Sequence, residues 1–347
     1  MKDVTMADVA DRAGVSKSTV SAVINDKDIV RDDTRERVWK AVDELDYRPS
    51  GSARRGFAAP TGKSLGFVIK EADNPYYTEV LAGIREVAAE QDYLTFVCSS
   101  EGAFDEEKEI VKQFSNKDLS GLIITPIVND DTDLSHIFEL ERKNIPFVLL
   151  EGVQGLRASI VDIDNVQASY EAANHLIELG HERIVHFAGP TYSDHTQRRI
   201  EGVRRAFSET HLVYTPDTAV EVGDSFQQGY ERGLDYFESR DADERPTGVT
   251  CYNDLTALGL MKALQELDID VPGDVSVVGF DDLNLLDYFP ISLTTIRVPK
   301  HEMGRRATEI LLDRIEEGRP NVPEQVSLEA TLMSRDSTAP PPGARSQ

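Results

Sequence analysis

The feature that most constrains the fold is a regular alternation of short apolar runs with amphipathic segments between residues 64 and 285. The apolar runs are 65–69, 94–99, 121–127, 145–151, 159–164, 183–189, 219–224, 247–254 and 275–282. The segments between them carry apolar residues at helical spacing, as Val80, Ile84 and Val87 do in the segment that begins at Pro75. This alternation predicts an α/β protein whose parallel sheets are covered by helices on both faces.

The number of strand–helix units predicts two parallel-sheet α/β subdomains, because a single sheet would be unusually wide. The units divide about equally between residues 64–160 and residues 160–285. A helix over 300–317 and a last strand over 326–333 must then return to these sheets. Ligands of such folds bind at the carboxyl ends of the strands, and two facing subdomains would form a cleft there.

The first 45 residues follow a different pattern, that of three short helices. Thr5, with Asp8 three positions later, predicts the start of the first helix, and Gly14 predicts its end. Ser16 predicts the cap of a second helix that runs to about Asn25. The start and apolar stripe of a third helix are indicated by Asp33, Glu36, Val38, Val42 and Leu45. A helix, a tight Gly turn and a second helix are the signature of a helix–turn–helix.

Net charge separates this front segment from the rest of the chain. The formal net charge is −25, but residues 1–60 hold 11 basic and 11 acidic residues, so the whole acidic excess follows residue 60. An acidic body repels nucleic acid and would confine any DNA contact to the front segment. The same excess also fits plain solubility or a salt-rich cytoplasm.

Several classes of protein are disfavoured by what the sequence lacks. Cys98 and Cys251 are far apart and have no CxxC partner, which argues for a reducing cytoplasm and against a disulfide framework or a zinc site. The start of the chain has no apolar signal-peptide core, and no apolar run approaches the roughly 20 residues of a membrane span. No GxSxG or HExxH motif occurs. We therefore expect a cytoplasmic protein that is not an enzyme and has no catalytic residue, metal, cofactor or membrane partner.

Several stretches of the chain together match one known family. They read "VTMADVADRAGVSKSTVSAVIND" (4–26), "TRERVWKAVDELDYRPS" (34–50), "NPYYTEVLAGIREVA" (74–88), "DNVQASYEAANHLIELGHERIVHFAGP" (164–190), "RRIEGVRRAF" (198–207), "CYNDLTALGLMKAL" (251–264) and "DVSVVGFDDL" (274–283). These stretches are spread over nearly the whole chain, and in them the sequence resembles the LacI/GalR family of bacterial repressors. The resemblance implies a DNA-binding headpiece, a hinge, and a core similar to periplasmic sugar-binding proteins, assembled as a dimer.

The pattern and the resemblance together divide the chain into five parts. These are a headpiece of 1–48, a hinge of 49–63, a first core subdomain of 64–162 plus about 291–320, a second core subdomain of 163–290 plus about 321–336, and a disordered tail of 337–347. The tail is Pro-rich and lacks heptads, so it cannot form the coiled coil that makes some members of the family tetramers. We therefore expect a homodimer.

The second helix of a helix–turn–helix lies in the major groove of DNA. Val20, Val23 and Ile24 would face inward, which places Ala22 with Lys17 on the opposite, exposed face. The resemblance assigns base reading to the first two helical positions, and Ser16, Thr19 and the helix N-terminus suit phosphates. The candidate DNA-binding residues of the headpiece are Thr5, Ser16, Lys17, Ser18, Thr19, Ser21, Ala22 and Asn25. The alternative is that these residues are only helix caps and solvated polar groups.

Two positions depart from the family pattern. The family usually has Arg at position 22, and Ala22 can contact only a thymine methyl or nothing, so the usual base preference does not carry over. In the hinge, Gly56 stands where the family places a Leu that wedges into the minor groove. Phe57 would replace that wedge, or Arg54 and Arg55 would read a narrow minor groove without one. A flexible linker that contacts no DNA is the third possibility.

The resemblance also places ligand contacts at the strand ends of the core. Matching positions are Asn74, Tyr76, Arg199, Asn253 and Asp281, with Phe226 and Glu151 as weaker candidates. This set offers the donors, acceptors and aromatic faces that a polyol needs, so a carbohydrate effector is favoured over a nucleobase. Strand-end capping or structural ion pairs are the alternative for each residue. The resulting function is an effector-controlled repressor that binds a pseudo-palindromic operator as a dimer; a transport-type sugar-binding protein is the rival.

Overall fold

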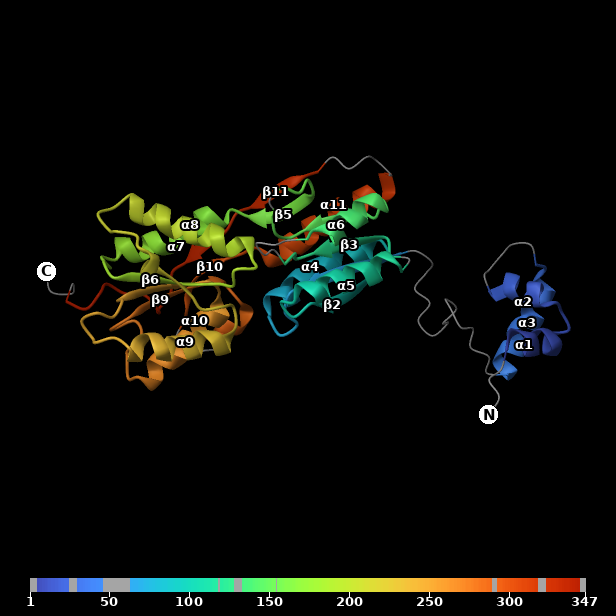
Figure 1. Ribbon diagram of the computed structural model, residues 1–347, viewed down its shortest axis with the longest axis horizontal. Coiled ribbons are helices and arrows are strands. Elements are labelled where there is room, and N and C mark those ends of the chain that lie inside the picture. The colour runs from blue at the N-terminus through green and yellow to red at the C-terminus, as the bar shows by residue number, and fades with distance from the viewer. Residues whose placement is uncertain are drawn as a thin grey trace. The chain divides into compact units, whose positions relative to one another are not determined.

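The computed structural model describes residues 5–24, 30–45, 63–117, 119–127, 133–153, 155–288, 292–317 and 323–343. The chain divides into two compact units, Met1–Thr61 and Gly62–Gln347 (Figure 1). The first unit carries the three predicted helices and the second carries the α/β core. No helix among the described residues has the length and apolar character that a membrane crossing requires.

The first unit is a three-helix bundle, α1 (Met6–Ala13), α2 (Lys17–Ile24) and α3 (Asp32–Glu44). Its core is formed by residues that include Val9, Val20, Val23, Val38 and Val42. The two valines of α2 are buried, which confirms their predicted inward orientation. The third helix begins one residue before the predicted Asp33.

The predicted helix starts in this unit are confirmed by their capping contacts. The backbone amide and the hydroxyl of Thr5 both donate to an Asp8 carboxylate oxygen, at 2.7 and 2.6 Å. The Ser16 hydroxyl accepts from the Thr19 amide at 3.1 Å and so satisfies a free N–H of α2. Gly14 ends α1 with φ +68°, a left-handed conformation that glycine adopts without strain. The helix–turn–helix prediction is therefore confirmed.

The first core sheet has the strand order β11-β5-β4-β3-β1-β2, with all neighbours parallel among the described residues. Its strands are β1 (Ser64–Ile69), β2 (Leu94–Ser99), β3 (Gly121–Ile124), β4 (Phe147–Leu149), β5 (Ser159–Ile163) and β11 (Gln325–Leu328). Its helices are α4 (Tyr76–Glu90), α5 (Phe104–Ser115), α6 (Ser135–Arg142) and α11 (Lys300–Glu317). Strands β1, β3 and β4 are buried throughout, as expected of parallel strands covered on both faces.

The second core sheet has the order β12-β10-β9-β8-β6-β7, and β12 runs antiparallel to β10. Its strands are β6 (Ile184–Ala188), β7 (Ala219–Glu221), β8 (Gly248–Cys251), β9 (Ser276–Asp281), β10 (Thr294–Arg297) and β12 (Thr331–Met333). Its helices are α7 (Asn165–Glu178), α8 (Asp194–Ser208), α9 (Phe226–Glu238) and α10 (Asp254–Glu266), with 3₁₀ turns at Pro216–Thr218 and Asn284–Tyr288. The two mostly parallel sheets confirm the predicted fold class.

The chain passes between the two sheets at three places: from β5 to α7, from β10 to α11 and from β11 to β12. Two predicted boundaries are therefore wrong. Strand β10, which falls within the 291–320 assigned to the first subdomain, lies in the second sheet, and β11, within 321–336, lies in the first. The expected single strand 326–333 is two strands. Apolar alternation reports a strand but carries no information about which sheet it joins.

The tail, predicted to be disordered over 337–347, is ordered through its described part. Ser337 is fully buried, and its hydroxyl accepts from the Thr294 amide at 2.8 Å and donates to the Val277 carbonyl at 2.6 Å. The carbonyl of Ala339 lies 2.9 Å from Nε2 of His181. Proline enrichment identified a segment without regular secondary structure, but these polar contacts fix it against the second sheet.

Candidate ligand cleft and nucleic-acid interface

The N-terminal end of α2 presents the predicted polar surface of the headpiece. Lys17 and Ser18 are exposed, in the first turn of the helix. The Ser16 hydroxyl lies 2.7 Å from the Ser18 hydroxyl and 2.8 Å from that of Thr19. Ser16 therefore has the structural capping role of the alternative interpretation, and its hydroxyl also contacts two neighbouring hydroxyls. Thr5 is exposed, with its hydroxyl bonded to Asp8.

Ala22 does not lie on the exposed face of α2 where the helical spacing placed it. Its side chain is 8% exposed, and Ser21 is half-buried. A methyl group extends one carbon from the helix and is easily covered by its surroundings, so helical spacing alone overestimated its exposure. The candidates Asn25, Arg54, Arg55 and Phe57 lie outside the described residues.

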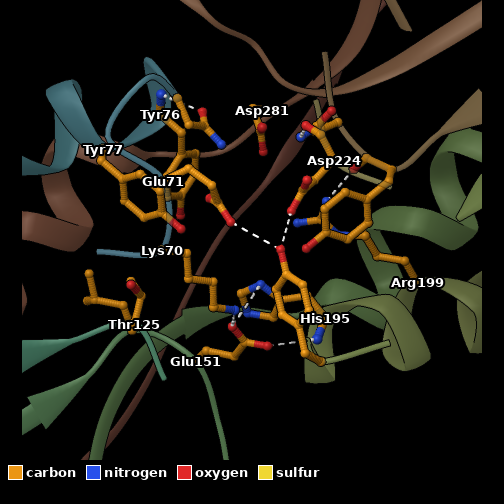
Figure 2. A pocket seen from close by; sticks show the side chains of 15 residues that line it. Lys70, Glu71, Tyr76, Tyr77, Thr125, Glu151, His195, Arg199, Asp224 and Asp281 are labelled. Atoms are coloured by element: carbon orange, nitrogen blue, oxygen red, sulfur yellow. Dashed lines mark hydrogen bonds and ion pairs between the residues drawn. The ribbon is translucent and has the colours of Figure 1, made fainter. Parts of the chain in front are cut away.

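A cleft lies between the two core sheets, at the carboxyl ends of their strands (Figure 2). The first subdomain contributes residues that follow β1, β3 and β4 or begin α4, and the second contributes residues that follow β7 and β8, end β9 or lie near the start of α8. The lining residues are Lys70, Glu71, Asn74, Tyr76, Tyr77, Thr125, Leu150, Glu151, Tyr192, His195, Arg199, Asp224, Tyr252, Asn253 and Asp281. This is the position at which α/β folds bind ligands.

Six of the predicted ligand residues line this cleft: Asn74, Tyr76, Glu151, Arg199, Asn253 and Asp281. The seventh, Phe226, does not; it begins α9 with its side chain 40% exposed, so the prediction of an aromatic cover from this residue is wrong. The cleft-lining residue of this segment is Asp224, two positions earlier.

Sequence reasoning missed several residues of the cleft. Lys70 and Glu71 directly follow the apolar run 65–69, and Asp224 ends the run 219–224, so their positions at strand ends were a usable signal. Tyr192 and His195 carried no such signal, because they come from the loop before α8 and from its first turn.

The cleft holds a buried ion pair. The Lys70 ammonium donates to Glu151 Oε2, and the two side chains are only 7% and 2% exposed (Figure 2). Glu151 Oε1 accepts from the Ser193 hydroxyl at 2.7 Å and from the His195 amide at 3.2 Å. Glu151 thus reaches from β4 of the first subdomain to the N-terminus of α8 in the second. We call Lys70, Glu151, Ser193 and His195 the latch cluster.

The charges of the latch cluster balance one another. Burial alone would raise the pKa of Glu151, but the nearby His195 and Lys70 outweigh burial and hold that pKa at about 2. Burial likewise lowers the pKa of Lys70, and Glu151 with its acidic neighbours more than reverses that effect. Both groups are therefore charged at neutral pH. Nε2 of His195 lies 3.1 Å from a carboxylate oxygen of Asp162, which extends the network.

Next to the latch cluster, the cleft places two carboxylates on one hydroxyl. The Tyr192 hydroxyl lies 2.8 Å from Asp224 Oδ2 and 3.2 Å from Glu71 Oε1. A phenol has one hydrogen to donate, so it cannot satisfy both acceptors at once. Burial and the nearby Asp224 charge raise the pKa of Glu71 to about 7. We call Glu71 and Asp224 the carboxylate pair.

A buried guanidinium also lines the cleft. Arg199, 5% exposed, donates to Asn165 Oδ1 at 3.0 Å and to the Tyr252 carbonyl. Its guanidinium carbon lies 3.6 Å from the ring centroid of Phe280. Burial raises the pKa of Asp281 to about 6, with Arg199 as the largest opposing influence. These groups provide donors and acceptors on several sides of a small polar molecule.

The two predicted asparagines have structural partners. Asn253 caps α10 by accepting from the Thr256 amide at 2.8 Å, and its amide donates to the Asp224 carbonyl at 2.6 Å. Asn74 Oδ1 accepts from the Tyr76 amide at 3.0 Å. Asn253 therefore has a helix-capping role, whereas α4 has Pro75 as its N-cap and no side-chain capping bond, and neither contact prevents the asparagine from lining the cleft. Among the described residues, no three His, Cys, Asp or Glu side chains gather as metal ligands would.

Both units match family models. Residues 5–50 match the model "Bacterial regulatory proteins, lacI family", and residues 173–338 match the "Periplasmic binding protein-like domain". The chain is 33% identical over 315 residues to the HTH-type transcriptional repressor PurR of Aliivibrio fischeri, covering 90% of this chain and 92% of that protein.

Solved structures agree with these matches. A transcriptional regulator CelR–cellobiose complex has a TM-score of 0.72 at 27% identity, covering 96% of this chain and 99% of that one. The lac repressor dimer bound to operator and the anti-inducer ONPF has a TM-score of 0.70 at 27% identity, covering 97% and 100%. Because the similarity spans the headpiece as well as the core, it excludes a transport-type binding protein. The chain belongs to the LacI family of bacterial transcriptional regulators, and it is a ligand-responsive, DNA-binding repressor of that family.

Proposed function

We propose that this repressor acts in the cytoplasm as a homodimer on a pseudo-palindromic operator and that a carbohydrate in the core cleft controls it. The observation that carries the effector part is the cleft itself, to which both subdomains contribute charged and aromatic side chains. A molecule that binds one arrangement of the subdomains better than another shifts the balance between them. No enzymatic step and no cofactor enter this proposal.

In the DNA interface, Lys17 and Ser18 read base edges from the first turn of α2. An ammonium donates to guanine O6 and N7, and a hydroxyl donates or accepts. The Ser16 and Thr19 hydroxyls and the helix N-terminus lie toward phosphates. Ala22, which is buried, makes no base contact, so the operator is read over fewer positions from this helix than a long side chain at position 22 would allow.

Selection of DNA from a random pool by the full-length protein tests this interface. We expect a two-fold symmetric site. Lys17→Ala should cost about 1–3 kcal/mol of discrimination at one base pair in each half-site. Lys40→Ala, which removes an exposed lysine of α3, should leave the base preference unchanged. If the wild type binds no sequence at any salt concentration, the operator proposal fails.

For the effector, the cleft favours a neutral polyol. Arg199 and Asn253 supply donors, Asp281 and the carboxylate pair supply acceptors, and the rings of Tyr76 and Tyr252 supply flat apolar faces. The CelR structure holds a sugar, which supports the same class by similarity. A nucleobase is the second candidate class.

A thermal-shift screen tests the effector class. The panel holds ribose, cellobiose, other neutral mono- and disaccharides, and adenine and hypoxanthine. We expect a sugar to raise the melting temperature and to change the operator affinity of the wild type. Arg199→Lys should abolish that rise, whereas Arg204→Lys, on the exposed face of the same helix, should not. A response only to nucleobases would replace the carbohydrate assignment.

The dimer is supported by the edge of the first sheet. Strand β2 is the outermost strand, and Leu94, Phe96 and Val97 are 45%, 46% and 39% exposed. A contiguous apolar edge strand in water invites pairing with another chain, and a second copy of the chain would cover it. Phe96→Lys should convert the dimer to a monomer in analytical ultracentrifugation. An unchanged sedimentation coefficient would place the interface elsewhere.

A further inference from the structure

Lys300, the first residue of α11, is a buried cation outside the cleft lining. Its residue is 3% exposed. The ammonium donates to the Asp281 carbonyl at 2.5 Å and to the Asp282 carbonyl at 3.0 Å. It also lies 3.5 Å from a carboxylate oxygen of Glu79 on α4. One lysine side chain therefore joins the end of β9 in the second subdomain to a helix of the first.

The strand end that Lys300 holds has an unusual backbone. Asp281 has φ +116° and Asp282 has φ +55°, both in the region that residues with a Cβ rarely adopt. Such conformations persist only where surrounding contacts enforce them. The two carbonyl groups converge on one ammonium, and the Asp282 carboxylate is held separately by Arg297 and Arg335, each at 2.6 Å. Lys300 is thus the cation that compensates the two carbonyl dipoles.

This strained turn determines where the Asp281 side chain lies. Asp281 lines the cleft, whereas Lys300 does not (Figure 2). The other charged or titratable groups that act on the Asp281 carboxyl include Arg199 and His195 from α8, Glu79 from α4 and Asp254 from α10. Without the ammonium, the backbone of Asp281 and Asp282 would lose the contact that favours positive φ, and the carboxyl would lose one of its nearby cations.

The contact with Glu79 places the same ammonium beside α4, the helix that begins with the cleft residue Tyr76. Helices α4 and α11 pack with their backbones in close approach. A Cβ at Gly83 would lie 2.0 Å from the His301 carbonyl oxygen, and one at Gly304 would lie 2.1 Å from that of Val80. This packing fixes the register of the first turn of α11 against α4. It therefore holds the backbone of Lys300 beside α4, within side-chain reach of Glu79.

We propose that Lys300 is a positioning residue for the effector site: it holds Asp281 in its cleft-facing conformation and ties that strand end to α4 of the other subdomain. The inference rests on the proposed effector site for its functional consequence, but the positioning itself is independent of any ligand. It predicts that effector affinity depends on a side chain that does not touch the effector.

The first test measures the strand end directly by hydrogen–deuterium exchange in the full-length protein. Lys300→Met should raise exchange in peptides covering residues 279–284 by about tenfold or more, because the local opening that exposes those amides becomes easier. Lys262→Met, which removes an exposed lysine paired with Glu266 on α10, should leave these peptides unchanged. Equal exchange in both variants would overturn the proposal.

The second test uses calorimetry with ribose and cellobiose as probes. Lys300→Met should weaken binding at least tenfold while the operator affinity of the sugar-free protein changes less than threefold. A parallel loss of operator affinity and thermal stability would mean a general structural role and would overturn the positioning role. If neither sugar binds the wild type, the carbohydrate assignment fails for these probes, and the exchange experiment alone decides the role of Lys300.

A milder variant keeps the proposal testable if Lys300→Met does not fold. Glu79→Met removes both oxygens of the contact to α4, from a side chain that is 26% exposed. It should raise exchange about threefold in peptides covering residues 76–82 and leave residues 279–284 near the wild-type rate. If exchange in the peptides covering residues 76–82 did not change, the proposed tie between the strand end and α4 would be wrong.

Discussion

The latch cluster and the carboxylate pair both bridge the subdomains, but they differ in how fully their polar groups are satisfied. In the latch cluster, each oxygen of Glu151 accepts from at least one donor, and the Lys70 ammonium faces a carboxylate. In the carboxylate pair, two acceptors share the single hydrogen of Tyr192. A satisfied network is suited to holding two parts together, whereas an unsatisfied one responds to protons or to a ligand that brings donors. Substitutions in each of the two groups separate these two roles.

The largest effect should come from breaking the latch cluster. Lys70→Met leaves the Glu151 carboxylate buried without its cation, which typically costs about 3–5 kcal/mol of unfolding free energy. Urea denaturation at pH 7 measures this cost. Lys262→Met, at an exposed ion pair, serves as the control and should change stability little. If Lys70→Met lost little unfolding free energy, the latch cluster would not stabilise the contact between the two subdomains.

The double variant Lys70→Met/Glu151→Met sharpens the same point. Replacing both partners removes the uncompensated charge. The double variant should therefore regain most of the unfolding free energy that Lys70→Met alone loses. A double variant as unstable as the sum of the two single variants would mean that the two side chains act independently.

The next effect is an acid-side pH dependence that belongs to Glu151. Its folded-state pKa of about 2 lies below the ordinary value of 4.5. A lowered carboxyl pKa contributes stability that is present above pH 4.5 and lost as the pH falls toward 2. The stability difference between wild type and Glu151→Gln should therefore shrink by about 2–3 kcal/mol between pH 6 and pH 2. A constant difference would contradict the charge balance described for the latch cluster.

The carboxylate pair should change stability with pH in the opposite direction to Glu151. The folded-state pKa of Glu71, about 7, lies above the ordinary 4.5, so its ionisation destabilises the folded protein as the pH rises from 4.5 through 7. Glu71→Gln should therefore be more stable than wild type at pH 8, by on the order of 1 kcal/mol after allowance for solvent screening, and nearly equal at pH 5. Glu266→Gln, at a surface carboxylate, should show no such gain. If the stability of Glu71→Gln and of wild type depended on pH in the same way, ionised Glu71 would not destabilise the folded protein, and the carboxylate pair would not be unsatisfied.

Local pattern predicted the parts of the molecule that depend on neighbours in sequence. The Thr5–Asp8 cap, the Ser16 cap and the alternation that produces two sheets all follow from residues a few positions apart. The strand ends that line the cleft were also predictable, because the carboxyl ends of parallel strands meet at one edge.

What sequence did not predict depends on partners far away in the chain. Lys70 and Glu151 are 81 positions apart, and nothing in either local stretch marks them as a pair. The sheet assignment of β10 and β11 depends on where the chain crosses between subdomains, which strand periodicity does not contain. Ser337 looked like part of a loose Pro-rich tail because its buried partners, Val277 and Thr294, lie more than 40 positions away.

The smallest expected effect tests whether the hydroxyl of Tyr192 is the shared donor of the carboxylate pair. At pH 8 Glu71 is ionised and supplies no hydrogen of its own, so Tyr192→Phe removes the hydrogen that the two carboxyl groups share and should cost about 0.5–1 kcal/mol. At pH 5 a protonated Glu71 supplies a donor of its own, so the cost should be smaller. Tyr230→Phe is the matched control, since the Tyr230 hydroxyl donates to the surface carboxylate of Glu266 at 2.7 Å and should show no change in cost between these pH values. If Tyr192→Phe cost the same unfolding free energy at pH 5 and at pH 8, the carboxylate pair would be as fully satisfied as the latch cluster. The contrast between the two groups would then fail.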